Sequence, residues 1–149
     1  MGDPPLCPSA RADAPDAVVI GIVDGSVDEP RVRQLERPVP VTEEILASTG
    51  PVDPARVLRI AASCLDDRCR HFADKRCAFA AKVVTMLPEV TESLPACGVR
   101  ARCRWFAEQG GAACRCCPQV VTQDPNPTPA MARAADPGCR LPDVATGRT

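Results

Sequence analysis

The order of apolar and polar residues predicts a β-hairpin near the start of the chain. Residues 17–23 form an apolar run rich in β-branched side chains, and Asp24-Gly25 follows it as a strong signal for a tight turn. Residues 27–35 alternate loosely between apolar and polar, so we expect them to pair back on the first run. Pro38 and Pro40 are expected to end this second strand, because proline donates no ladder hydrogen bond.

Helix signals follow at three places. Thr42 can cap a short helix that reaches about Ser48. Asp53-Pro54 places a favoured cap before a proline at the first helical position, which predicts a helix that leads to Cys64. Farther along, apolar residues recur at steps of three and four before a terminating Pro88 and predict one buried helix face: Phe79, Val83, Val84, Met86 and Leu87.

Proline and polar residues are frequent at both ends of the chain and predict little regular structure there. The expected organisation is a flexible N-terminus (1–16), a hairpin and helix region (17–63), a mainly helical cysteine-rich domain (64–117) and a disordered proline-rich tail (118–149). The formal charge is −4 before position 64, +3 over the cysteine-rich domain and zero over the tail. The predicted fold class is α+β, with the acidic first part packed against a helical domain.

Composition changes this picture in one respect, the source of stability. Among 149 residues there are ten cysteines and 17 prolines, but aromatic residues make up only 3%. A core of Ala, Val and Leu buries little area per residue, so it stabilises a fold weakly. We therefore expect a bound metal to nucleate the cysteine-rich domain and to contribute much of its folding free energy.

The expected compartment decides how the cysteines are interpreted. The longest apolar run, residues 17–23, is far shorter than the roughly 20 residues of a membrane span, and no secretory signal is visible after Met1. We therefore expect a cytoplasmic protein with no membrane partner. Cytoplasmic thiols stay reduced, so a dense set of cysteines indicates metal ligation more than disulfide bonds.

Eight of the ten cysteines lie in the central domain, where the sequence repeats itself. Each copy has a cysteine, a gap of four or five residues, then Cys-Arg-(His/Trp)-Phe-Ala, and later another cysteine. The first copy contains Cys64, Cys69 and Cys77, and the second contains Cys97, Cys103, Cys114, Cys116 and Cys117. In each copy a phenylalanine follows the second cysteine by three residues, which would place its ring over the sulfur on one helix face.

The second copy supplies a complete set of four thiolates: Cys97, Cys103, Cys114 and Cys117. The gaps are longer and less regular than those of zinc knuckles, and a proline follows the last cysteine, as in some ferredoxins. This pattern favours a [4Fe–4S] cluster. Zinc is the alternative, because Cys114 and Cys117 form one Cys-x2-Cys pair.

The first copy has only three thiolates, so the fourth ligand of a second site stays open. The candidates are His71, Cys116 and water, and the chain would hold either one cluster or two. Cys7 and Cys139 lie in the ends predicted to lack structure, so they are not expected to be ligands.

Arginines adjoin the cysteines and would offset the negative charge of a cluster: Arg68, Arg70, Arg100, Arg102, Arg104 and Arg115. The same side chains could contact phosphates, but a charge of +3 over the domain is modest, so nucleic-acid binding is not favoured. No phosphate-binding loop, serine nucleophile motif or His-Glu-x-x-His motif occurs, and an enzyme is not favoured either.

These observations predict a small cytoplasmic iron–sulfur protein for electron transfer or redox sensing. Its partner would be a redox or regulatory protein, with this chain as an accessory to a larger enzyme. The alternative is a zinc-stabilised interaction or DNA-binding regulatory module.

Overall fold

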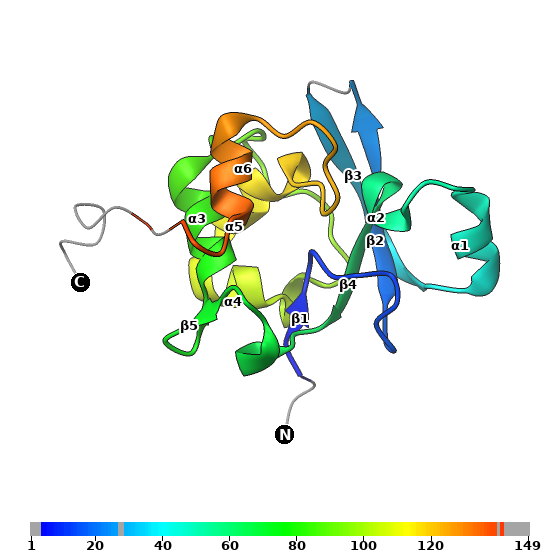
Figure 1. Ribbon diagram of the computed structural model, residues 1–149, viewed down its shortest axis with the longest axis horizontal. Helices are drawn as coiled ribbons and strands as arrows, with labels where there is room; N and C mark the ends of the chain where they lie inside the picture. The colour runs from blue at the N-terminus through cyan, green and yellow to red at the C-terminus, as the bar shows by residue number, and fades with distance from the viewer. Residues whose placement is uncertain (1–3, 27–28, 140, 142–149) are drawn as a thin grey trace.

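The computed structural model describes residues 4–26, 29–139 and 141, and it contains both sheet and helices, as an α+β fold requires (Figure 1). Four antiparallel strands form the main sheet in the order β1-β4-β2-β3. Their bounds are β1 (Leu6–Cys7), β2 (Val18–Gly25), β3 (Pro30–Pro40) and β4 (Leu58–Ser63). Figure 1 shows the helices α3 to α6 gathered on one side of this sheet, with α1 (Glu43–Ser48) on the other.

The predicted hairpin is confirmed as β2 and β3. Gly25 has a φ of 85°, the left-handed conformation that glycine adopts readily, and it pairs with Pro30. Pairing extends to Val18 and Pro40, so the prolines do not end the second strand as expected. β3 is an edge strand, where a missing backbone donor is tolerated.

Both predicted helix starts after the hairpin are confirmed, but the second helix is short. The Thr42 side chain caps α1 by accepting from the Ile45 N–H at 3.2 Å, and Asp53 caps α2 (Pro54–Val57) by accepting from Ala55 at 2.9 Å. The prediction that α2 leads to Cys64 is wrong, because Leu58–Ser63 forms β4. This strand lies between β1 and β2 with most of its residues buried, so sheet pairing overrides the local helix signal.

The cysteine-rich part contains helices α3 (Ala78–Met86), α4 (Arg104–Gln109) and α5 (Gly111–Cys116). It also has three 3₁₀ turns, η1 (Asp66–Arg68), η2 (Arg100–Arg102) and η3 (Cys117–Gln119), and a small two-stranded ladder of β5 (Phe72–Ala73) and β6 (Arg76–Cys77). The predicted central helix is confirmed as α3, which ends before Pro88. Its buried residues join a core built around Trp105, together with Phe79, Val83, Leu87, Val120 and Met131.

Two predictions about the ends of the chain differ from the structure. Within the predicted disordered tail, helix α6 (Pro129–Ala135) packs against α3 and buries Met131 and Ala134. The overlooked signal is Thr128 before Pro129, a cap followed by proline at the first helical position. Within the predicted flexible N-terminus, β1 pairs with β4, and Leu6 is only 4% exposed. Positions 1–3, 140 and 142–149 of these predicted ends lie outside the described residues.

None of the helices in the described part of the chain combines the length and the apolar character needed to cross a membrane.

Candidate metal centre

Four of the five cysteines of the second copy line one cleft. Cys97, Cys103, Cys114 and Cys117 border it together with the rings of Trp105 and Phe106, with Ile20 and Gln34 from the sheet, and with Arg100. Two of these cysteines are buried and two are half-buried. The four residues predicted as ligands of the second copy therefore border a common cleft.

Each of these cysteines is placed by a different local structure. Cys103 is the residue before α4, Cys114 lies in α5, and Cys117 begins η3. Cys97 lies in a loop held against β3, because the next residue, Gly98, donates its N–H to the Leu35 carbonyl at 3.2 Å. A Cβ atom on Gly98 would lie 2.5 Å from Cδ of Pro38, so only glycine allows this close approach.

Every sulfur of the four accepts a hydrogen bond from a nitrogen. Cys97 accepts from the backbone of Val99, and Cys103 accepts from the backbone of Phe106 and Trp105. The other two accept from side chains, Cys114 from Arg100 Nε at 3.3 Å and Cys117 from Gln34 Nε2 at 3.5 Å and Arg59 Nη2 at 3.0 Å. Donors aimed at sulfur stabilise the thiolate, which is the form that binds metal.

Arg59 is the main site residue that sequence reasoning missed. Its side chain is fully buried, and it donates to the carbonyls of Pro8 at 2.6 Å, Cys117 at 2.9 Å and Val120 at 3.0 Å, besides the sulfur of Cys117. Its guanidinium carbon lies 5.5 Å from the centroid of the Trp105 ring. No carboxylate of the described residues forms an ion pair with it. The available signal was a lone charge inside the apolar run of residues 57–62.

Burial makes two thiols of the site, those of Cys97 and Cys103, hold their protons more firmly when no metal is bound. Desolvation raises the pKa of Cys103 to about 11 and also raises the pKa of Cys97. Metal binding at this site therefore displaces protons, and the neighbouring nitrogen donors lower the free-energy cost of doing so.

The first copy resembles the second only at its start. In both copies a 3₁₀ turn, η1 or η2, ends directly before the second cysteine. After Cys103 the chain enters α4, whereas after Cys69 it forms the β5–β6 ladder. The expectation that Phe72 and Cys69 share a helix face is therefore wrong, because Phe72 lies in β5 and pairs with Cys77.

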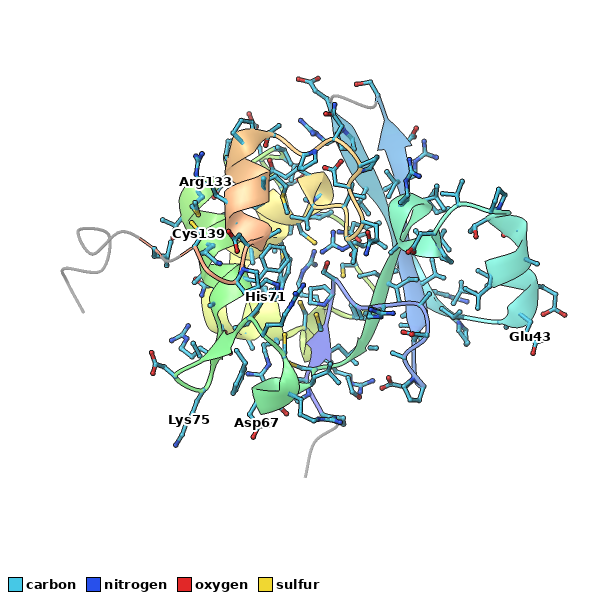
Figure 2. The ribbon with its side chains drawn as sticks, viewed as in Figure 1. Glu43, Asp67, His71, Lys75, Arg133 and Cys139 are labelled. Carbon is cyan, nitrogen blue, oxygen red and sulfur yellow. The ribbon has the colours of Figure 1, made fainter. Side chains whose placement is uncertain are left out.

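The two residues proposed from sequence to complete the first copy have other contacts. The His71 ring stacks on Phe79 with centroids 4.9 Å apart, and its Nδ1 is buried without a hydrogen-bond partner. Burial, followed by the charges of Lys82 and Arg70, lowers the pKa of His71, so its ring is neutral. Cys116 is buried in the helical core, where its sulfur lies 3.8 Å from the Leu87 carbonyl oxygen. Figure 2 shows His71 near the centre of the view, whereas Asp67 and Lys75 extend outward.

The predicted arginines play unequal roles. Arg100 contacts the site directly. Arg104 forms ion pairs with Asp66 and with Glu108, the latter at 3.0 Å, and Arg115 pairs with Glu89 at 3.0 Å. Two arginines therefore donate hydrogen bonds to sulfurs of the cleft. One is Arg100, from the repeat, and the other is Arg59, from a strand outside the repeat.

Over residues 4–26, 29–139 and 141, no group of three or more His, Cys, Asp or Glu side chains is arranged to hold a metal ion. No protein-family model, curated protein or solved structure matches the chain.

Proposed function

We propose that the chain is a cytoplasmic iron–sulfur protein that carries a [4Fe–4S] cluster on Cys97, Cys103, Cys114 and Cys117 and works in electron transfer or redox sensing. The observation that supports this proposal most is the shared cleft, in which every one of the four sulfurs already has a nitrogen donor. Four thiolates are the ligand set of such clusters.

The buried charge of Arg59 adds an independent argument. An ionised side chain in the interior is costly unless an opposite charge is close. Arg59 donates to neutral carbonyls and to one cysteine sulfur. An oxidised [4Fe–4S] cluster with four thiolates has a net charge of about −2, which would offset this cation and that of Arg100.

The surroundings of the cleft suit a redox centre. Trp105 and Phe106 supply an apolar wall that limits water, while the two half-buried cysteines, Cys97 and Cys114, lie nearer the surface. Hydrogen bonds to the sulfurs and nearby cations favour the reduced, more negative cluster, so they raise its reduction potential. A protein partner would exchange electrons or read the cluster state from the exposed side.

Zinc is the second candidate, because Cys114 and Cys117, one Cys-x2-Cys pair, both line the cleft. A zinc protein would be an interaction module or a DNA-binding regulator, with no redox change at the metal.

The test is anaerobic purification followed by measurement of iron, acid-labile sulfide and zinc per chain. We expect a brown protein whose iron falls sharply in Cys103→Ser. Cys116→Ser is the matched control, since Cys116 is also buried but its sulfur lies against Leu87. A colourless protein with stoichiometric zinc would overturn the iron–sulfur assignment and favour the second candidate.

A further inference from the structure

The structure brings Cys7 to the three cysteines of the first copy. We propose that Cys7, Cys64, Cys69 and Cys77 form a second four-thiolate site, which binds an iron–sulfur cluster beside the first. This inference takes its chemistry from the proposed function, but it uses a separate set of residues.

Strand pairing places Cys7 next to Cys64. β1 and β4 are antiparallel, with Cys7 opposite Ala62 and Leu6 opposite Ser63, and the Cys64 N–H continues the ladder to the Pro5 carbonyl at 2.9 Å. Side chains alternate between the faces of a sheet, so Cys7 and Cys64 lie diagonally on one face, a separation of roughly 7–8 Å. Two thiols placed on one face in this way can reach a common metal or cluster.

The remaining two cysteines come from the segment directly after β4. Cys69 follows η1, and the Phe72 N–H donates to its carbonyl at 3.0 Å. Phe72 in turn pairs with Cys77 across the β5–β6 ladder. The thiol of Cys77 interacts electrostatically with those of Cys69 and Cys7, and Cys7 also interacts with Cys64, so the four thiols form one connected group.

The four sulfurs share a pattern of backbone contacts. Each accepts from an N–H two or three residues later in the chain, in Ser9 for Cys7, Asp66 for Cys64 at 3.4 Å, His71 for Cys69 at 3.4 Å and Ala80 for Cys77 at 3.4 Å. The same local contact occurs at Cys97 and Cys103 in the first site. A backbone N–H directed at each sulfur would donate a hydrogen bond to the thiolate when metal is bound. Cys116, whose sulfur lies against the Leu87 carbonyl oxygen, lacks this arrangement.

Arginine side chains lie near two thiols of the second site. Arg104 interacts electrostatically with Cys64, and Arg59 interacts with Cys7. The Cys7 side chain is largely desolvated, and this burial raises the pKa of its thiol. Two acidic residues also lie near the site: Glu108 accepts from the Cys77 N–H at 2.9 Å, and Asp66 donates its N–H to the Cys64 sulfur. Both carboxylates pair with Arg104.

The two sites are neighbours through β1. Leu6 forms an isolated bridge with Cys103, a ligand of the first site, and the next residue is Cys7, a ligand of the second. A protein with both clusters loaded and reduced should therefore show magnetic interaction between them.

The experiment is anaerobic reconstitution of the full chain with ferrous iron and sulfide, with iron, sulfide and zinc counted per chain. The wild type should bind about eight iron atoms, as two [4Fe–4S] clusters require. Cys7→Ser and Cys69→Ser should each lose about half of this iron. The two variants should give the same electron paramagnetic resonance signal, that of the remaining cluster, with no magnetic interaction between clusters. Cys103→Ser should lose the other half, and the control Cys116→Ser should lose none.

Other results would overturn the inference separately from the proposed function. If Cys69→Ser loses iron while Cys7→Ser keeps all of it, Cys7 is not the fourth ligand. If the wild type holds about four iron atoms and all core variants lose one common signal, a single cluster is shared. If the wild type takes zinc alone, the proposed function fails, and the second site stands only if Cys7→Ser lowers the zinc count by half.

A measurement on the wild type covers the case in which Cys7→Ser does not fold. Alkylation at each cysteine can be followed by mass spectrometry in metal-loaded and metal-free protein at a pH where the free thiol reacts. Cys7 should be protected by metal to the same extent as Cys69. Equal labelling of Cys7 in the two forms would refute its role as a ligand.

Discussion

A buried cation without a carboxylate is the strongest constraint at the scale of single residues. The Arg59 side chain extends from β4 to η3, where its guanidinium donates hydrogen bonds to the carbonyl oxygen and the sulfur of Cys117. The backbone carbonyls that it satisfies belong to three separate segments, at Pro8, Cys117 and Val120. This one side chain therefore joins the sheet, the N-terminal segment and the metal centre.

Replacement of Arg59 by Met should both destabilise the protein and change the cluster. Loss of buried charge-assisted hydrogen bonds should lower the free energy of unfolding by about 3 kcal/mol, as measured by chemical denaturation. The reduction potential of the cluster should fall, because a cation beside it is gone. Arg33→Met in β3 is the control, since Arg33 is mostly exposed and pairs with Asp24 at the surface. An unchanged potential in Arg59→Met would contradict the proximity of this residue to the cluster.

The raised thiol pKa values predict how the metal-free protein responds to pH. Burial raises the pKa of Cys103 from 9.0 to about 11, so between these values the folded state binds more protons than the unfolded chain. Stability should therefore be constant below about pH 8 and fall above about pH 9, by up to about 1.4 kcal/mol per pH unit for each such thiol. Urea denaturation at several pH values measures this slope. It should be shallower in Cys103→Ala, and an equal slope would argue against burial of this thiol.

At the scale of elements, β4 connects the two cysteine sets. Its central position brings β1 to one side and β2 to the other. It carries Arg59, which reaches the first site, and it ends directly before Cys64 of the second. A helix in its place, as the local signal predicts, would have paired with neither strand.

The loop that carries Cys97 should tolerate no side chain at Gly98. A Cβ there would lie 2.5 Å from Pro38 Cδ and 2.6 Å from the Glu36 carbonyl oxygen, so the loop must move away from β3. Gly98→Ala should thus weaken iron binding at the first site, as counted after reconstitution. Gly138→Ala is the control, because its Cβ would make only ordinary contact. Full iron content in Gly98→Ala would show that the position of this loop is not needed.

Helix α6 should contribute to stability although it lies in a proline-rich segment. Met131 is buried against the helical core, so Met131→Ala should lower the free energy of unfolding by about 2–4 kcal/mol. Arg133→Ala on the exposed side of the same helix should have little effect (Figure 2). Thermal or chemical denaturation compares the two variants. Equal stabilities would mean that α6 does not pack on α3 in solution.

At the scale of the whole molecule, the candidate metal centre lies where the sheet meets the helices. Gln34 and Arg59 reach it from the sheet, and Cys103, Cys114 and Cys117 reach it from the helical part. One buried apolar cluster, Leu6, Ile20, Ala61 and Val99, already joins the sheet to the segment that precedes η2. A bound cluster would add a further link between the sheet and the helical part.

Removal of the metal should loosen this junction more than the hairpin. Chelation or oxidation of a bound cluster should speed hydrogen exchange in α4, α5 and β1, while β2 and β3 keep their mutual pairing. Hydrogen-exchange mass spectrometry of loaded and metal-free protein measures this by segment. Identical exchange in the two forms would show that the metal does not hold the fold together.

Local signals predicted the elements that depend on nearby residues. The pairing of β2 with β3, the caps at Thr42 and Asp53, and the apolar face of α3 all follow from short-range signals, and all are found. The predicted turn at Asp24-Gly25 is not found there, because both residues belong to β2 and pair with Arg31 and Pro30. Prediction failed where distant pairing decides. The length of α2 and the strand β1 both depend on contacts with β4, which sequence spacing does not reveal.

The residues of the candidate site also fall into two groups, those predicted from local spacing and those found only in the tertiary structure. The sequence by itself predicted the candidate set Cys97, Cys103, Cys114 and Cys117, because these cysteines lie within one short segment whose spacing is visible, and the four border one cleft. Only the tertiary structure decided that Arg59 serves this site and that Cys7 lies beside Cys64. Each pair is more than fifty residues apart in the chain. The pairing of β1 with β4 places Cys7 beside Cys64, and the central position of β4 in the sheet places Arg59 against Cys117. A side chain's role across such a distance is set by strand order and register, which no local pattern encodes.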